Sequence, residues 1–275
     1  MISSRIGPLL ALLSMLSMLS IATPALSAQK YDSTADKTFF TRQDAVLSGV
    51  AVGGSAVISI FDERIGRWMR SPGVQGSQSR HDLMENLTVI NEVPLTIGAV
   101  VVYGVGRLTG SDATTKIGLH ATEALVLTVA TAELIRGPLG RARPRESPND
   151  AFNFKFGGGF TDFGRRSYPS LHAAVAFATA SVLTGELDER NPDAVPYVAP
   201  ALYAVAMIPG LTRMYLDQHW ASDVAAGAFL GTLLGTRVVS YAYSHRPSKL
   251  ERALLAVTVV PDGHGHVMLM KTLGN

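Results

Sequence analysis

Long apolar segments separated by shorter polar ones make up most of the chain. Six of them, rich in Ala, Leu, Val and Gly, cover residues 44–61, 93–108, 114–136, 170–186, 196–215 and 222–243. Each is about four to six helical turns long, whereas strands of that length are unusual. The pattern therefore predicts an all-α fold, a helical bundle of about six core helices, within a domain that spans residues 44–245.

The connections between these segments differ in character. Residues 62–92 are charged, and we expect a short helix at about residues 81–90. Residues 137–169 are rich in Gly, Pro, Arg and Phe, and a loop of that length is usually functional or disordered. Its FGGGF stretch, residues 156–160, lacks the Gly-Lys-Ser/Thr of a phosphate-binding loop, so we interpret it as a flexible linker. The C-terminal tail, residues 246–275, predicts a short β-hairpin around PDGHGH.

The first 28 residues have the pattern of a secretory signal peptide. Arg5 supplies a positive charge, an apolar core follows, and TPALSA offers small residues for cleavage after Ala28, or alternatively after Ser27. Residues 29–43 then form a polar lead-in. An uncleaved membrane anchor is the alternative interpretation of residues 1–28. In a bacterium, either interpretation predicts a periplasmic or membrane-associated protein.

Composition narrows the class of protein. The chain has 275 residues, of which 47% are hydrophobic and 17% are charged, as in a globular or membrane-linked protein. A net charge of +2 gives no case for a nucleic-acid partner, and the absence of cysteine excludes disulfides and thiolate chemistry. The longest charge-free runs, residues 45–61 and 194–212, are at the lower limit for a membrane span. A soluble bundle and a membrane bundle therefore both remain open, and the sequence predicts no oligomeric state.

Three polar clusters interrupt the apolar pattern in the second half of the chain. They contain Arg136 and Arg143-Pro144, then Pro169-Ser170-Leu171-His172, then Thr212-Arg213, His219 and Asp223. Together they resemble the signature of the type 2 phosphatidic acid phosphatase superfamily, which includes bacterial acid phosphatases, lipid phosphatases and vanadium haloperoxidases. That signature is Lys, six residues, Arg-Pro; then Pro-Ser-Gly-His; then Ser-Arg, five residues, His, three residues, Asp. The resemblance covers about residues 114–243.

Three positions depart from the signature. Arg136 replaces Lys, which keeps the charge but presents a planar fork. Leu171 replaces Gly, and its bulk could narrow the pocket, although its backbone N–H stays available. Thr212 replaces Ser, a nearly neutral change. These departures bear on substrate range and rate more than on reaction class.

The residue types suit the hydrolysis of phosphate esters. Phosphoryl transfer needs positive charge around the phosphate oxygens, which Arg136, Arg143 and Arg213 can supply as guanidinium forks. Ser170 and Leu171 open a helix whose N-terminal N–H groups attract anions. We find no metal-ligand motif such as HExxH, so we expect no metal and no cofactor, with vanadate acting as an inhibitor.

The resemblance also implies the roles of the remaining residues. His219 would be the nucleophile, and Asp223 would orient its ring. His172 would protonate the leaving alcohol and later activate water, which predicts a rate maximum at mildly acidic to neutral pH. The expected substrate is a phosphorylated small molecule or a lipid phosphate. The alternatives are a haloperoxidase with vanadate as its cofactor, and an inactive phosphate- or lipid-binding member of the family.

Two further expectations concern the surroundings of the site. Arg141 and Arg145 have no position in the signature, so we expect both to be solvated, whereas Arg165 and Arg166, just before the second cluster, could reach the rim of the phosphate site or a lipid headgroup. In relatives with six spanning helices the site faces outward and the N-terminus lies inside. A signal sequence here would reverse that arrangement, which favours a soluble or peripherally bound periplasmic body.

Overall fold

The computed structural model describes residues 38–245 together with two strands nearer the C-terminus, residues 257–261 and 267–271. The expected signal peptide and its cleavage site lie outside the described residues, as do residues 29–37 of the lead-in. The turn of the expected hairpin, residues 262–266, lies outside them as well.

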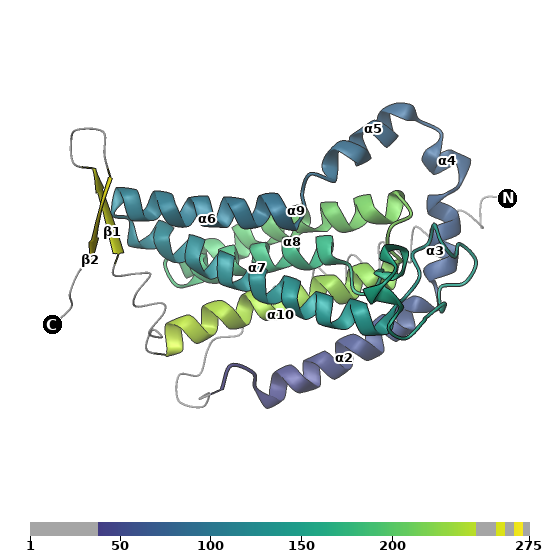
Figure 1. The fold of residues 1–275 in the computed structure, drawn as a ribbon, viewed down its shortest axis with the longest axis horizontal. Helices are drawn as coiled ribbons and strands as arrows, with labels where there is room; N and C mark the ends of the chain where they lie inside the picture. The colour runs from purple at the N-terminus through teal and green to yellow at the C-terminus, as the bar shows by residue number, and fades with distance from the viewer. Residues whose placement is uncertain (1–37, 246–256, 262–266, 272–275) are drawn as a thin grey trace.

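Six long helices form the bundle, as the apolar pattern predicted (Figure 1). Each matches one predicted segment to within about three residues at its ends, the usual uncertainty of helix boundaries. They are α2 (Arg42–Ser59), α6 (Glu92–Thr109), α7 (Asp112–Leu139), α8 (Leu171–Asp188), α9 (Val195–Tyr215) and α10 (Ala221–Ser244).

The charged connection between α2 and α6 contains three shorter helices, α3 (Asp62–Met69), α4 (Pro72–Gln75) and α5 (Gln78–Leu87). Helix α5 is the short helix that the sequence predicted, whereas α3 and α4 were not predicted. On α3, Ile65 and Met69 are buried against Met214 and Val224, which belong to α9 and α10. This packing holds α3 at one end of the bundle, near the long connection between α7 and α8 (Figure 1).

Helix α8 is the central helix of the bundle. It is apolar around its whole circumference, as expected for a helix covered on all sides, and it packs against α7, α9 and α10. Helix α10 approaches it closely because small residues line the contact. A Cβ atom on Gly227 would lie 2.3 Å from the carbonyl oxygen of Ser170, and one on Gly231 would lie 1.9 Å from that of Ala174. Glycine is therefore required at both positions.

The connection between α7 and α8 folds back on the end of α7. It contains two 3-10 turns, η1 (Gly158–Phe160) and η2 (Phe163–Arg165). Gly159 is buried, and a Cβ atom there would lie 2.2 Å from the carbonyl oxygen of Arg136. The interpretation of residues 156–160 as a flexible linker was therefore wrong, because this glycine run packs tightly against a helix end.

The C-terminal strands β1 (Val257–Pro261) and β2 (Val267–Lys271) pair antiparallel, with Val257 opposite Lys271. They are the two strands expected for the hairpin.

Within the described residues, three helical segments are long and apolar enough to cross a membrane. They are Asp112–Leu139, Pro192–Tyr215 and Ala221–Ser244, and the number rises to five if the bent pairs α2–α3 and α5–α6 each count as one span. Helix α6 also exposes large apolar side chains along its length, including Val93, Ile97, Val101 and Leu108. Exposed apolar surface of this extent is typical of a membrane or protein contact.

Candidate active site

His219 lies in the short connection between α9 and α10 and is almost completely buried. Its Nδ1 atom is 2.8 Å from the backbone carbonyl oxygen of Ser167. A carbonyl oxygen can only accept, so Nδ1 carries the proton in the neutral ring and Nε2 keeps a free lone pair. The geometry thus leaves one ring nitrogen able to act as a nucleophile.

Asp223 stands in the first turn of α10, where its carboxylate caps the helix by accepting from the Trp220 N–H at 2.8 Å. The same Oδ2 atom accepts from the Ser167 hydroxyl at 2.6 Å and lies 3.7 Å from His219 Nδ1. The direct partner of the imidazole is therefore the Ser167 carbonyl, and Asp223 holds Ser167 in place while contributing negative charge next to the ring.

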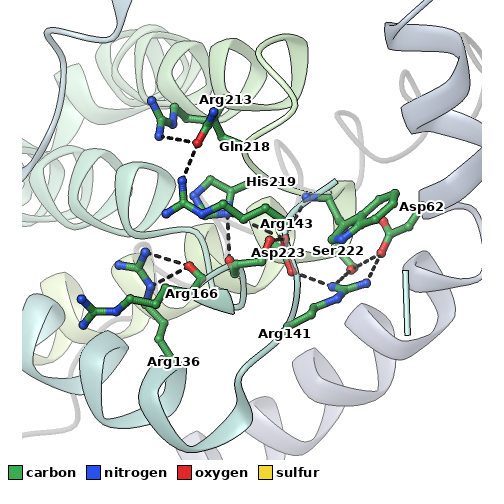
Figure 2. A network of polar contacts seen from close by, with 12 residues as sticks. Asp62, Arg136, Arg141, Arg143, Arg166, Arg213, Gln218, His219, Ser222 and Asp223 are labelled. Atoms are coloured by element: carbon green, nitrogen blue, oxygen red, sulfur yellow. Dashed lines mark hydrogen bonds and ion pairs between the residues drawn. The ribbon is translucent and has the colours of Figure 1, made fainter. Parts of the chain in front are cut away.

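Arg141 supports this carboxylate from the other side. It donates to Asp223 Oδ1 at 2.6 Å and to Asp62 Oδ2 at 2.7 Å, and it also bonds the hydroxyl of Ser222 (Figure 2). Its side chain is only 2% exposed. The prediction of a solvated Arg141 was therefore wrong: the guanidinium neutralises two buried carboxylates, one of them supplied by α3. Arg145, in contrast, is exposed as predicted.

Arg143 and Arg213 converge on one acceptor, the side-chain oxygen of Gln218 (Figure 2). Arg143 is buried and stacks over the ring of Phe163 at 4.4 Å from the ring centroid. Within the described part of the chain, the Nε atoms of both arginines have no protein acceptor. Buried donors normally have partners, so this arrangement suits an additional anion.

Arg136 is held differently. Its guanidinium donates to the backbone carbonyl of Arg166 at 2.8 and 3.0 Å and to Glu133 at 2.9 Å. The side chain of Arg166 pairs with the same Glu133 carboxylate, while Arg165 bonds Asn153. Arg166 thus contacts the site through its bonds to Arg136 and Glu133, whereas the Arg165 side chain points to Asn153.

The second cluster opens α8. Ser170 is the residue before the helix, its backbone N–H donates to the Asp223 carbonyl at 2.9 Å, and its buried hydroxyl has no acceptor among the described residues. Leu171 is buried in the apolar cluster with Ala124, Val175 and Val238. Its side chain therefore packs into the core, and its N–H remains one of the helix-end donors that lack an intrahelical acceptor.

The rings of His172 and His219 lie close together, with centroids 6.5 Å apart and planes inclined by 54°. His172 lies on α8, which is not one of the helices long and apolar enough to cross a membrane. The pKa of His172 is lowered to about 3, most of all by burial and then by the nearby charges of Arg213, His219, Arg136 and Arg143, in that order. His172 therefore lies within electrostatic reach of His219 and of all three predicted arginines.

Burial also lowers the pKa of His219 to about 4, with the negative charge of Asp223 opposing the shift. The pKa of Arg143 falls to about 9 because the residue is buried and then because Arg136 and Arg213 lie nearby. A group of cations that depress each other's pKa is a site that favours an incoming anion.

Sequence reasoning missed four residues of this site: Asp62, Ser167, Gln218 and Ser222. The positions of Ser167 and Gln218 offered a signal, because Ser167 comes three residues before Ser170 and Gln218 directly precedes His219. Nothing in the local sequence indicated that Asp62 belongs to the site, since its partners lie about 80 or more residues away along the chain.

A comparison of the sequence with known families fits this geometry. The profile of the PAP2 superfamily matches residues 118–247, a segment that contains all three clusters. This segment therefore matches the PAP2 superfamily, as the resemblance of the three clusters predicted.

Two curated relatives are phosphatases by name. A lipid A 1-phosphatase of Porphyromonas gingivalis is 44% identical over 69 residues, which are 25% of this chain and 15% of the relative. A lipid A 4'-phosphatase of Bacteroides thetaiotaomicron is 29% identical over 157 residues, which are 53% of this chain and 62% of the relative. Both alignments span less than two thirds of the relative.

One solved structure is also similar. It is a transmembrane PAP2-type phosphatidylglycerolphosphate phosphatase from Bacillus subtilis, 18% identical, with a TM-score of 0.44. The alignment covers 88% of this chain and 98% of that one.

Proposed function

We propose that this PAP2 protein is a membrane-associated phosphatase that hydrolyses phosphate monoesters of lipids through a phosphohistidine intermediate. The observation that supports this proposal best is that three guanidinium groups lie near enough to His172 to act on its charge, while its ring lies 6.5 Å from that of His219 between centroids. The donor atoms of Arg143, Arg213 and Ser170 that lack protein acceptors fit the oxygens of a phosphate group.

The proposed reaction has two steps. In the first, Nε2 of His219 attacks phosphorus in line, the P–O bond to the lipid alcohol breaks, and His172 gives its proton to the leaving oxygen. In the second, His172 takes a proton from water, the hydroxide attacks phosphorus, and the P–N bond breaks to release orthophosphate and free His219. The arginines stabilise the negative charge in both steps, so we propose that no metal is needed.

The proposed substrate class follows from the relatives and from the surface. Both curated relatives are lipid A phosphatases by name, and the apolar exposed faces of the helices suit a lipid environment. We therefore favour lipid phosphates over soluble phosphomonoesters, with lipid A phosphates among the candidates. The secretory pattern of residues 1–28 supports export of the helical body, and the site then lies on the periplasmic side if that body does not span the membrane with all six helices.

The packing of Leu171 bears on the alternative of an inactive, binding-only protein. The concern was that leucine in place of glycine would fill the pocket, but its side chain belongs to the core cluster of α7, α8 and α10. The substitution is therefore compatible with catalysis.

Hydrolysis of p-nitrophenyl phosphate and of phosphatidate in mixed micelles tests the proposal. We expect turnover that survives EDTA, is blocked by vanadate and is lost in His219→Ala. His81→Ala, which changes a histidine of α5 that pairs with Glu85, is the matched control and should retain activity. Oxidation of bromide that needs vanadate and peroxide would indicate a haloperoxidase, and phosphate binding without any turnover would indicate a binding protein.

The role of His172 has its own test. An alkyl phosphate needs a proton on its leaving oxygen, whereas p-nitrophenolate leaves without one. His172→Ala should therefore slow alkyl phosphate hydrolysis by about 100-fold or more relative to its effect on the nitrophenyl ester. Equal losses on both esters would exclude His172 as the general acid.

A further inference from the structure

Gln218 occupies an unusual place between two cations of the site. Its Oε1 atom accepts from Arg143 Nη1 and, at 3.3 Å, from Arg213 Nη2 (Figure 2). Its Nε2 atom donates to the carbonyl of Leu216 at 3.3 Å. Because guanidinium groups only donate, this arrangement turns the amide oxygen toward the arginines and the amide nitrogen toward the backbone.

The two arginines come from different parts of the chain. Arg143 follows the end of α7, and Arg213 lies in the last turn of α9. Two like charges brought together in a buried site repel each other, and among the described residues no carboxylate accepts a hydrogen bond from either one. An acceptor shared by both is therefore needed to keep their forks directed at the same point.

We propose that Gln218 is a positioning residue of the anion site, whose amide oxygen keeps Arg143 and Arg213 converged without adding charge. The inference rests on the proposed function. It adds to that function the residue that orients two of the three arginines toward the phosphate. An oxygen from the substrate then replaces, or adds to, a neutral hydrogen-bond acceptor, so the full attraction between the cations and the phosphate is retained.

Arg136 provides the internal comparison. Its guanidinium is paired with the carboxylate of Glu133 at 2.9 Å, so part of its charge is already neutralised. A carboxylate at position 218 would treat Arg143 and Arg213 in the same way and would compete with the phosphate. The side-chain type at position 218 should therefore set phosphate affinity.

The test uses the full chain in detergent and compares wild type with Gln218→Met and Gln218→Glu. Methionine has a similar length but accepts poorly, whereas glutamate has the same shape and adds a charge. Binding of orthophosphate and of vanadate is measured by calorimetry, and KM and kcat are measured with p-nitrophenyl phosphate. Gln78→Met, at an exposed position of α5, is the matched control.

We expect Gln218→Met to raise the Kd for phosphate and the KM about tenfold, with a smaller effect on kcat, because hydrogen bonds to charged groups are lost. Gln218→Glu should raise both by about 100-fold, since its carboxylate competes directly with the phosphate. The two variants should unfold at similar temperatures. A shorter amide, Gln218→Asn, should fall between wild type and Gln218→Met, and it replaces the methionine variant if that one does not fold.

Unchanged phosphate affinity in either Gln218→Met or Gln218→Glu would overturn the inference. Equal losses in the two variants would also overturn it, because a merely structural role would not depend on charge. If the wild-type chain binds neither phosphate nor vanadate, there is no anion site for Gln218 to organise, and the inference is wrong. If it binds both but hydrolyses nothing, the proposed function fails, and the binding measurements still decide the role of Gln218.

Discussion

His219 keeps a lone pair on Nε2 because a backbone carbonyl accepts from its other ring nitrogen, Nδ1. The Ser167 carbonyl fixes the proton on Nδ1, and Asp223 binds the Ser167 hydroxyl and sits beside the ring. A carbonyl cannot take up the proton, so the tautomer required for nucleophilic attack is set by the fold itself. In the proposed mechanism, the carboxylate then stabilises the positive charge that develops on the ring as it is phosphorylated.

The lowered pKa values predict a pH dependence. In the proposed mechanism His219 must be neutral to attack, so its pKa of about 4 predicts that activity falls as the pH drops through about 4. His172 must be protonated, and its pKa of about 3 in the free site means that kcat/KM declines as the pH rises from acid. A bound phosphate adds negative charge next to His172 and favours its protonated form. The alkaline limb of kcat should therefore lie at higher pH than that of kcat/KM.

Steady-state rates from about pH 3.5 to 9 check this expectation, because kcat/KM reports the free enzyme and kcat the complex. In His172→Gln the alkaline limb should flatten, which separates the titration of His172 from that of the substrate. A rate that keeps rising into alkali would contradict the assignment of both histidines.

The sequence singled out three clusters that lie close together in the structure, but it did not predict the contacts between their side chains. The spacing of His219 and Asp223 placed the two on adjacent turns, and they do lie close together. The shared partner of Arg143 and Arg213, and the burial of Arg141, depend on which side chains the fold brings together across the chain. Local spacing carries no information on such pairs, so the pattern wrongly predicts a surface position for an arginine outside the signature.

At the scale of elements, α3 contributes to the site although it lies before the segment matched by the superfamily profile. Its Asp62 joins Arg141 and thereby the carboxylate of Asp223. The sequence did not predict α3, because eight residues of mixed charged and apolar character give too short a pattern to separate a helix from a loop. The long helices were predicted because apolar runs of four to six helical turns are too long for ordinary strands or loops.

Removal of the Arg141 cation should destabilise the bundle strongly. In Arg141→Met the carboxylates of Asp62 and Asp223 lose their shared cation in a buried site, a change that typically costs about 3–5 kcal/mol. We expect the thermal midpoint in detergent to fall by roughly 10 °C, and by less in Arg141→Lys. The addition of Asp62→Asn to Arg141→Met should restore part of the loss, since one unpaired charge is then gone. Strictly additive effects of the two substitutions would contradict this coupling.

The close contact of α8 and α10 predicts a second stability effect. Gly227→Ala would place a Cβ atom 2.3 Å from the Ser170 carbonyl, so the helices must separate where they carry His172 and Asp223. We expect a loss of about 1–3 kcal/mol together with a fall in kcat. Gly98→Ala on α6, where a Cβ atom meets nothing within 4 Å, is the control and should be neutral or slightly stabilising. A similar thermal midpoint for both variants would show that the contact is not tight.

For the whole molecule, the surface favours the membrane-associated alternative that the sequence left open. Composition alone could not decide, because the apolar runs are only just long enough to span and a soluble core has the same residue types. The arrangement of the helices adds the missing information, since it leaves valines of α2 and α6 on the outside. Val46, Val50, Val101 and Val105 each expose about half of their surface or more.

This surface predicts how the chain behaves on fractionation. If the apolar faces of α2 and α6 contact lipid, the chain should stay in membranes washed with alkaline carbonate and should leave them only in detergent. The intact mass of the retained chain shows whether residues 1–28 have been removed. A chain that begins at Gln29 and still resists carbonate must be held by the helical body, whereas an uncleaved chain would leave the N-terminal segment as a second anchor. Release of the mature chain with the soluble periplasm would exclude the membrane-bound arrangement, and the site would then have to reach lipid phosphates from the aqueous phase.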